Sequence, residues 1–226
     1  MLNMSLSCFS IEFSDVVMSY SVGTQALKGI SMQIEDGEFC FLVGPSGSGK
    51  STIIKLITGE LQPTSGTVHV NGYSLERIRK REVPYMRRTV GVVFQDFRLI
   101  SNMTVYENVA FAMRVVGALE KEIRERVPYV LELVGLENKS RRHPTELSGG
   151  EQQRVAIARA LSMDTKVLLA DEPTGNLDSK NSEYLFGILE SLAHEDGYCV
   201  IIVTHDETLA KLTDRTIRMV DGTIAE

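Results

Sequence analysis

The stretch GPSGSGKST, residues 44–52, combines residue types and spacing that suit phosphate binding. It matches the pattern G-x-x-x-x-G-K-[ST], and it lies between an apolar run and a helical pattern, as a phosphate-binding loop requires. Its glycines permit positive φ angles, so that successive backbone N–H groups can converge on an anion. Lys50 supplies a positive charge to the outer phosphates, and the hydroxyl of Ser51 is a ligand for Mg²⁺. The stretch therefore predicts a nucleotide site.

Polar residues end three further apolar runs: Gln95 in GVVFQDF, Asp171 and Glu172 in VLLADEP, and His205 in IIVTHD. The carboxyl ends of parallel strands face the ligand crevice of an open α/β sheet. Asp171 is expected to hold Mg²⁺ through water, and Glu172 to lie within reach of a water molecule that attacks the γ-phosphate. Gln95 offers a neutral oxygen to the metal or to that water. Each residue alone also fits a solvated strand end, but beside a phosphate loop they predict an active site.

A second anion-binding pattern lies in TELSGGEQQR, where Ser148, Gly149 and Gly150 stand at the start of a predicted helix. Unpaired backbone N–H groups and the positive end of the helix dipole point outward at such a start. A single nucleotide site does not need two phosphate cradles in one chain. The residues alone do not explain this duplication.

The elements that position these residues follow from the spacing of apolar positions. Strands are predicted at residues 10–20, 29–34, 38–44, 66–72, 166–172 and 198–205. The last two are continuous apolar runs, which are typical of strands buried on both faces of a parallel sheet. The chain is expected to end in a hairpin that turns at Asp221-Gly222.

Helices are predicted at residues 49–61, 104–117, 120–136, 148–163 and 181–196. Thr104 and Glu107 form a capping-box pattern at the start of the second. Pro128 predicts a break or a restart within the third. The fold is thus expected to be one α/β domain with a helical insertion at 98–163.

Composition is that of a soluble globular protein: 226 residues, 43% hydrophobic and 24% charged. The 24 basic and 30 acidic residues give a net charge of −6, which argues against nucleic acid as a partner. The sequence contains neither a signal peptide nor an apolar stretch long enough to cross a membrane. Cys8 has no metal-ligand spacing to the other cysteines, while Cys40 and Cys199 lie in apolar runs and are interpreted as buried free thiols of a reducing compartment. A cytoplasmic protein is expected.

Together these motifs resemble the nucleotide-binding subunits of ABC ATPases, in that family's order and over essentially the whole chain. Residues 44–52 match the Walker A motif, LSGGE at 147–151 the signature, VLLADE the Walker B motif and NLD at 176–178 the D-loop. Glu151 stands where the common pattern has glutamine, although some branches carry LSGGEQQR as their normal form. The resemblance implies a P-loop NTPase fold with a RecA-like parallel-sheet core (1–97 and 164–226), an N-terminal antiparallel β portion, and a helical subdomain at 98–163.

The resemblance also implies roles for individual residues, with ATP and Mg²⁺ as cofactors. Catalytic roles fall on Glu172, the Q-loop residue Gln95 and the switch histidine His205; Mg²⁺ is assigned to Ser51, Gln95 and Asp171. Nucleotide binding is assigned to Tyr20, which matches the aromatic that stacks on adenine, and to Gly44, Pro45, Ser46, Gly47, Ser48, Gly49, Lys50, Ser51, Thr52, Ser148, Gly149, Gly150 and Asp178. In the family two subunits pair head to tail, and each signature closes on the γ-phosphate held by the other subunit. A homodimer with ATP sandwiched at both sites would account for the second cradle.

Within the family, FQDFRL and TVYENVAF look most like the cell-division ATPases. That likeness implies an integral membrane partner of the FtsX type, a place at the cytoplasmic face of the membrane through that partner, and control of cell-wall hydrolysis. The nearly identical motifs of lipoprotein-release and macrolide-efflux exporters leave an export role open. A soluble DNA-associated ABC ATPase is the remote alternative, because the chain has no long coiled-coil or zinc-bearing insertion and is acidic.

The segment RIRKREVPYMRR, residues 77–88, concentrates basic residues in an acidic protein: Arg77, Arg79, Lys80, Arg81, Arg87 and Arg88. One interpretation is a solvated face. The other is a contact with the anionic cytoplasmic leaflet or with an acidic partner.

Overall fold

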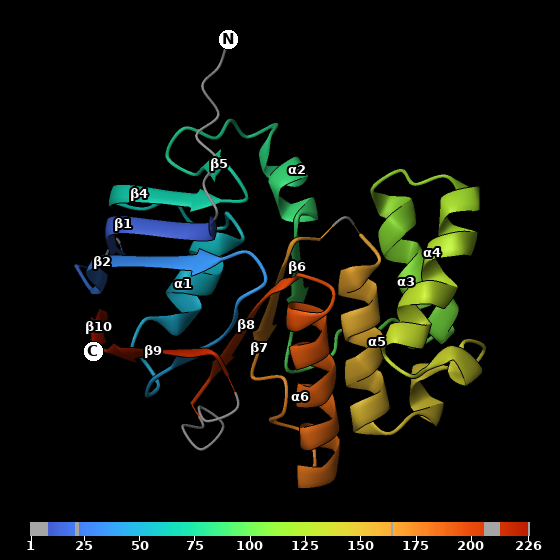
Figure 1. Cartoon of the computed structure of the whole chain (residues 1–226). Coiled ribbons are helices and arrows are strands. Elements are labelled where there is room, and N and C mark those ends of the chain that lie inside the picture. The colour runs from blue at the N-terminus through green and yellow to red at the C-terminus, as the bar shows by residue number, and fades with distance from the viewer. Residues whose placement is uncertain (1–8, 21–22, 164, 206–212, 226) are drawn as a thin grey trace.

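The computed structural model describes residues 9–20, 23–163, 165–205 and 213–225. Two sheets form its framework (Figure 1). The smaller sheet has the order β2-β1-β4-β5 and is antiparallel. Its strands are β1 (Phe9–Ser19), β2 (Gln25–Glu35), β4 (Ser65–Val70) and β5 (Tyr73–Ser74).

The larger sheet has the order β10-β9-β3-β8-β7-β6 and is parallel from β9 to β6, with β10 antiparallel at its edge. Its strands are β3 (Phe39–Val43), β6 (Val90–Val93), β7 (Val167–Asp171), β8 (Cys199–Thr204), β9 (Arg215–Val220) and β10 (Thr223–Ala225). β3 and β8 are buried along their whole length. Their continuous apolar sequences are explained by this burial, because both faces of the sheet are covered.

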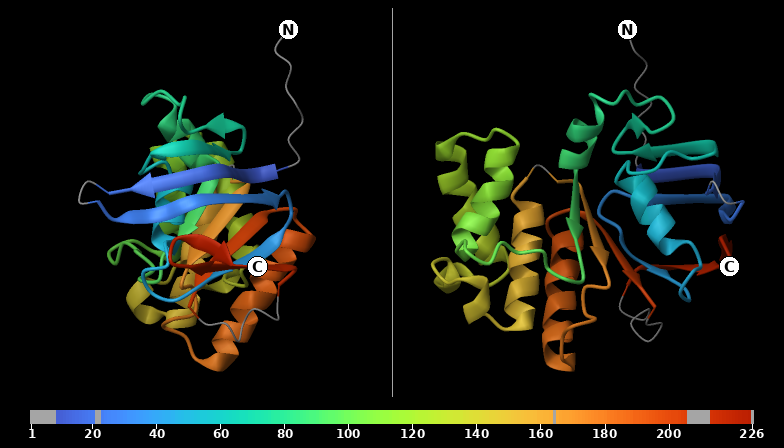
Figure 2. Two further views of the ribbon diagram at one scale, coloured as in Figure 1. Left: turned by 90° about the vertical axis from the view of Figure 1, so that its left-hand side faces the viewer. Right: turned by 180° about the vertical axis from the view of Figure 1, so that it is seen from behind.

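The helices cover the larger sheet unequally on its two sides (Figure 2). They are α1 (Lys50–Ile57), α2 (Val83–Arg88), α3 (Val105–Val115), α4 (Glu120–Leu133), α5 (Gly149–Leu161) and α6 (Ser179–His194), with short 3-10 turns at Glu137–Lys139 and Pro144–Glu146. Phe39, Phe41 and Val43 of β3 point into the core shared with α3 to α6. Cys40 and Leu42 point into the core shared with α1 and the smaller sheet. The two-residue period of the strand thus places one core on each face.

The chain forms the predicted fold class: a parallel core, an antiparallel N-terminal sheet, and a helical insertion that contains α3 to α5. The predicted capping box at the start of α3 is confirmed, since Thr104 and Glu107 exchange side-chain and backbone hydrogen bonds. The predicted final turn is confirmed as well, with Asp221 at φ 47° and Gly222 at φ 79°, the two positive values of a type I′ hairpin.

The predicted break at Pro128 is wrong, because α4 runs through it without interruption. Pro128 and Arg124, whose carbonyl loses its hydrogen-bond donor, both lie on the exposed face of the helix. Water can therefore satisfy that carbonyl. On the opposite face, Ile123 and Val127 are fully buried and hold the helix against its neighbours. Tertiary packing here outweighs the local cost of the proline.

Candidate active site

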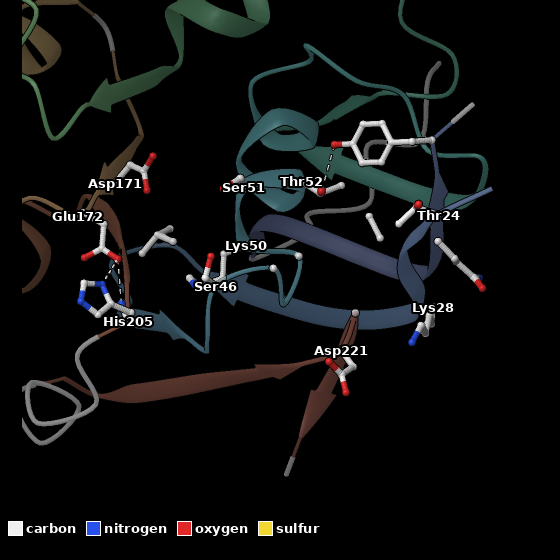
Figure 3. A pocket seen from close by; sticks show the side chains of 17 residues that line it. Thr24, Lys28, Ser46, Lys50, Ser51, Thr52, Asp171, Glu172, His205 and Asp221 are labelled. Carbon is white, nitrogen blue, oxygen red and sulfur yellow. Dashed lines mark hydrogen bonds and ion pairs between the residues drawn. The ribbon is translucent and has the colours of Figure 1, made fainter. Parts of the chain in front are cut away.

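A pocket of about 620 Å³ lies where the ends of β7 and β8 approach the start of α1 (Figure 3). Its size is within the range of small-molecule sites. In the view of Figure 3, Asp171, Glu172 and His205 lie on one side of Lys50, and Lys28 lies on the other. The pocket is lined by Tyr20, Thr24, Gln25, Ala26, Lys28, Ser46, Gly47, Gly49, Lys50, Ser51, Thr52, Asp171, Glu172, Val203, His205, Asp221 and Gly222.

The glycine loop wraps the start of α1, with Gly47 at φ 82° and the N-cap residue Gly49 at φ 110°. A Cβ atom at Gly49 would come within 2.9 Å of the Ala26 carbonyl oxygen, so the close approach of β2 also leaves no room for a side chain at this position. No side chain caps α1, and its first turn carries no acidic residue. Its first backbone N–H groups therefore face the pocket without a competing carboxylate, as an anion site requires.

The side chain of Lys50 is held over the glycine loop by backbone carbonyl groups of that loop. Its Nζ donates to the carbonyl oxygens of Gly44 at 2.5 Å and Pro45 at 3.0 Å. Burial lowers the pKa of Lys50, while the carboxylates of Glu172 and Asp171 oppose that shift. The ammonium group is thus fixed at the loop, where a bound phosphate would be its strongest available partner.

Asp171 and Glu172 have different surroundings although they are adjacent. Burial raises the pKa of Asp171, and the negative charge of Glu172 adds to this effect. Glu172 has a left-handed backbone (φ 48°) and accepts hydrogen bonds from the Thr204 hydroxyl at 3.0 Å and the His205 backbone N–H at 2.9 Å. Its Oε1 also lies 2.7 Å from Nδ1 of His205. A non-glycine residue in this conformation is strained, and the hydrogen bonds hold it there.

This arrangement has a clear chemical capacity. The carboxylate of Glu172, fixed by an imidazole, can orient a water molecule and accept its proton. Ser51 and Asp171 both line the pocket, and one hydroxyl with one carboxylate fits Mg²⁺, which takes its other ligands from water and phosphate. Within the residues that the structure describes, no cluster of three or more histidine, cysteine, aspartate or glutamate side chains forms a denser metal site.

Tyr20, predicted to contact the base, lies in the pocket wall, and its hydroxyl is 3.2 Å from the Thr52 hydroxyl. Gln95 is not among the lining residues. Its backbone oxygen accepts a hydrogen bond from Asn176 at 2.9 Å, and a Cβ atom at Gly175 would come 2.8 Å from its Nε2. Its predicted roles in metal binding and catalysis stay predictions.

The signature residues are also outside the pocket of their own chain. Ser148 caps α5, and Gly150 packs on Asn181, whose Cγ would lie 2.9 Å from a Cβ atom at that glycine. The backbone N–H of Asn181 in turn donates to Asp178 at 2.8 Å, which caps α6. The signature and Asp178 therefore form one neighbouring surface, separate from the phosphate loop.

Of the Walker A residues predicted to bind nucleotide, Gly44, Pro45 and Ser48 do not line the pocket. Gly44 and Ser48 instead hold the loop against the final hairpin. A Cβ atom at Gly44 would come 2.3 Å from the Met219 carbonyl oxygen, and the Ser48 carbonyl accepts a hydrogen bond from Gly222 at 3.0 Å.

Sequence reasoning missed the pocket wall formed by β2 and the final hairpin. This wall contributes Thr24, Gln25, Ala26, Lys28, Asp221 and Gly222. The backbone N–H of Lys28 donates to the Gly222 carbonyl at 2.9 Å, which joins the two segments. The Asp221-Gly222 turn was visible in the sequence, but nothing in it indicated that the turn packs beside the phosphate loop. Lys28 had no sequence signal and adds a second cation to the pocket.

Comparison with known proteins identifies a family and several relatives of this chain. A family model described as ABC transporter matches residues 27–175. The cell division ATP-binding protein FtsE of Streptococcus pneumoniae serotype 2 (strain D39) is 48% identical over 215 residues, which cover 95% of this chain and 93% of that protein. FtsE of Escherichia coli strain K12 is 45% identical over 213 residues, covering 94% and 96%.

Solved structures agree with these relatives. The dimeric ABC transporter cassette MJ0796 has 39% identity and a TM-score of 0.84, covering 96% of this chain and 97% of its own. A second dimeric structure of that cassette, in a post-hydrolysis state bound to ADP and Pi, has 38% identity and a TM-score of 0.83 with the same coverage.

Proposed function

This chain belongs to the ABC transporter family, and from that premise we propose that it is the ATPase subunit of a membrane complex that acts in cell division. It hydrolyses ATP to ADP and phosphate. The finer proposal is that it works with a membrane partner of the FtsX type and thereby controls cell-wall hydrolysis. The observation that carries this assignment is its 45% to 48% identity, over nearly its whole length, to proteins that are named for cell division.

The proposed catalytic cycle uses the pocket residues in distinct roles. Lys50 and the first N–H groups of α1 bind the outer phosphates, and Tyr20 borders the base. Ser51 and Asp171 would hold Mg²⁺, which neutralises phosphate charge in such sites. Glu172 orients the attacking water and takes its proton, while His205 holds the carboxylate in position. The 2.7 Å contact between the side chains of Glu172 and His205 supports these two roles.

We further propose that the site is completed by a second copy of the chain. Ser148 and its neighbouring glycines form an anion-binding helix start, yet they line no part of the pocket in their own chain. In a head-to-tail pair this helix start would meet the γ-phosphate of the partner. Two dimeric structures of the cassette MJ0796, with 38% and 39% identity to this chain, support that pairing. ATP then holds the dimer closed, and hydrolysis lets it open.

A groove of about 370 Å³ is the proposed contact for the membrane partner. It lies between the segment after Gln95 and helices α3 and α5, and Arg98, Ile100, Phe111, Val115, Arg159 and Met163 are among its lining residues. Phe111 and Val115 keep 42% and 67% of their surface exposed, so an apolar side remains uncovered in the single chain. No helix among the described residues is long and apolar enough to cross a membrane. We propose that the chain lies at the cytoplasmic face of the membrane through this partner.

Co-purification with candidate partners tests the proposal. The chain is expected to be retained by an FtsX-type membrane protein, and Phe111→Asp with Val115→Asp should abolish retention while ATP binding persists. Leu119→Asp, at a position with 68% exposure outside the groove, is the matched control and should be retained. Retention by a lipoprotein-release or macrolide-efflux permease instead would favour the export alternative. Depletion of the chain should block division, whereas normal division would contradict the cell-division role.

A further inference from the structure

The basic segment 77–88 links the smaller sheet to the parallel core, as the loop after β5 and the short helix α2 (Figure 1). It contributes no residue to the nucleotide pocket and none to the groove beside α3. Its charges are therefore not explained by phosphate binding or by the proposed docking of the membrane partner.

The structure divides the basic residues of this segment into two groups. Arg87 is tied to the end of α1, donating from Nε to the Thr58 carbonyl at 2.9 Å and from Nη2 to the Gly59 carbonyl at 3.3 Å. The guanidinium of Arg88 lies 5.0 Å from the centre of the Tyr85 ring. The remaining four are exposed, and we call them the basic patch: Arg77, Arg79, Lys80 and Arg81.

The basic patch has no ion-pair partner among the residues that the structure describes. The acids nearest in sequence already have other partners. Glu76 accepts from the Ser74 hydroxyl and from the Val68 backbone N–H at 3.4 Å, and Glu82 accepts from the backbone N–H of Arg79 at 2.9 Å. Four neighbouring cations thus remain available on a protein whose net charge is −6.

We propose that the basic patch binds the anionic phospholipid headgroups of the membrane surface. Arginine presents a planar fork that matches phosphate oxygens, and three of the four cations are arginines. Tyr85 stands beside the patch with 57% of its surface exposed, and tyrosine is favoured at the headgroup level because its ring is apolar and its hydroxyl is polar. The proposal rests on the proposed function only in placing the chain near a membrane.

The expected attraction is weak for the single chain and useful in a complex. Each basic residue near an anionic surface increases binding about fivefold, so four give a partition constant on the order of 10³ M⁻¹ at low salt. Such binding cannot anchor the protein alone. Combined with a membrane partner, it would act as a second contact that fixes the orientation of the subunit.

Vesicle sedimentation tests the inference with the purified full chain. The probe is sucrose-loaded phosphatidylcholine vesicles with or without about one-third phosphatidylglycerol, at millimolar lipid and low salt. We expect binding to the anionic vesicles only, reversed by salt because exposed charges are screened. Alanine at all four patch positions should reduce the partition constant at least tenfold. The control, with the same change in net charge, replaces exposed Lys121, Arg124, Arg141 and Lys166 by alanine and should keep most of the binding.

Two results would overturn the inference: no sedimentation of the wild-type chain with anionic vesicles, or equal loss in the patch and control variants. The first result would favour an acidic protein as the partner of the basic patch. The second would mean that vesicle binding depends on the net charge of the chain and not on the position of the patch. ATP hydrolysis in solution is measured on both variants and should equal that of the wild type. Hydrolysis and partner retention report on the proposed function, so its failure is distinguishable from failure of lipid binding.

Discussion

Lys139 is expected to influence ATP-dependent pairing although it does not line the nucleotide pocket. Its Nζ lies 3.2 Å from Oε1 of Glu151, and the other oxygen of Glu151 accepts from the Ser148 N–H at 2.9 Å and from its hydroxyl at 3.1 Å. The Ser148 N–H, with a smaller contribution from Lys139, holds the pKa of Glu151 below its usual range. A carboxylate is therefore ionised in the turn that is proposed to face the partner's γ-phosphate. Lys139 offsets that negative charge.

The size of the effect follows from the exposure of Lys139. Lys139 keeps 43% of its side-chain surface, so its attraction to the partner's γ-phosphate, which is made only in the dimer, is worth at most ~1 kcal/mol, as for other exposed ion pairs. A dimer has two such sites, and alanine at position 139 would therefore weaken ATP-dependent dimerisation by up to ~2 kcal/mol, or about 30-fold. ATP binding by the monomer should be unchanged, because Lys139 does not line the pocket of its own chain.

Sedimentation equilibrium with MgATP, in a Glu172→Gln background that prevents turnover, measures the dimer constant. Adding Glu151→Gln to Lys139→Ala removes the uncompensated charge and should restore dimerisation. Arg142→Ala is the control, since it breaks a neighbouring surface pair with Glu146 at 2.8 Å and should have little effect. An unchanged dimer constant in Lys139→Ala would refute the reasoning, as would failure of Glu151→Gln to restore it.

Three further predictions concern single groups. Lys50→Ala should weaken MgATP binding at least tenfold by removing the charge that faces the phosphates; unchanged affinity in calorimetry would exclude the loop as the site. The hydrogen bond to Asp214 raises the pKa of His194, so protonation of His194 stabilises the folded chain. This contribution to the free energy of unfolding is complete below the unfolded-state pKa of ~6.5 and is lost as pH rises through the folded-state pKa. His194→Gln should therefore lower the melting temperature more at pH 5.5 than at pH 9, and equal losses would contradict the pairing. Burial raises the pKa of Cys199 to about 12 and also raises the pKa of Cys40. In a Cys8→Ser variant, both thiols should therefore resist a thiol reagent at pH 8 until the chain unfolds. Rapid labelling of the native variant would contradict their burial.

The part of the site that the sequence predicted depends on local rules. The glycine loop has a fixed pattern, Asp171 is the last residue of β7, and Glu172 and His205 directly follow β7 and β8. Neighbouring parallel strands end at one edge of a sheet, so the convergence of these side chains could be predicted without information on distant contacts. The 2.7 Å contact between Glu172 and His205 is a consequence of that convergence.

What the sequence did not predict depends on contacts between elements that are far apart in the chain. Lys28 lines the pocket because β2 packs against the hairpin at Gly222, a pairing that no local pattern specifies. Pro128 predicted a break because its cost is local, while the burial of Ile123 and Val127 that offsets it is tertiary. The division of the basic segment into structural and free cations likewise required the positions of the α1 carbonyls.

The central claim is that Glu172 activates water in a site that a second copy of the chain completes. The most direct measurement is the molar mass of Glu172→Gln by light scattering with and without MgATP, together with its rate of ATP hydrolysis. Loss of the residue that orients and deprotonates the water should slow hydrolysis at least ~10²-fold. ATP binding remains, so the account predicts a stable dimer in MgATP that dissociates when the nucleotide is removed. Near-normal hydrolysis, or a monomer in saturating MgATP, would contradict it.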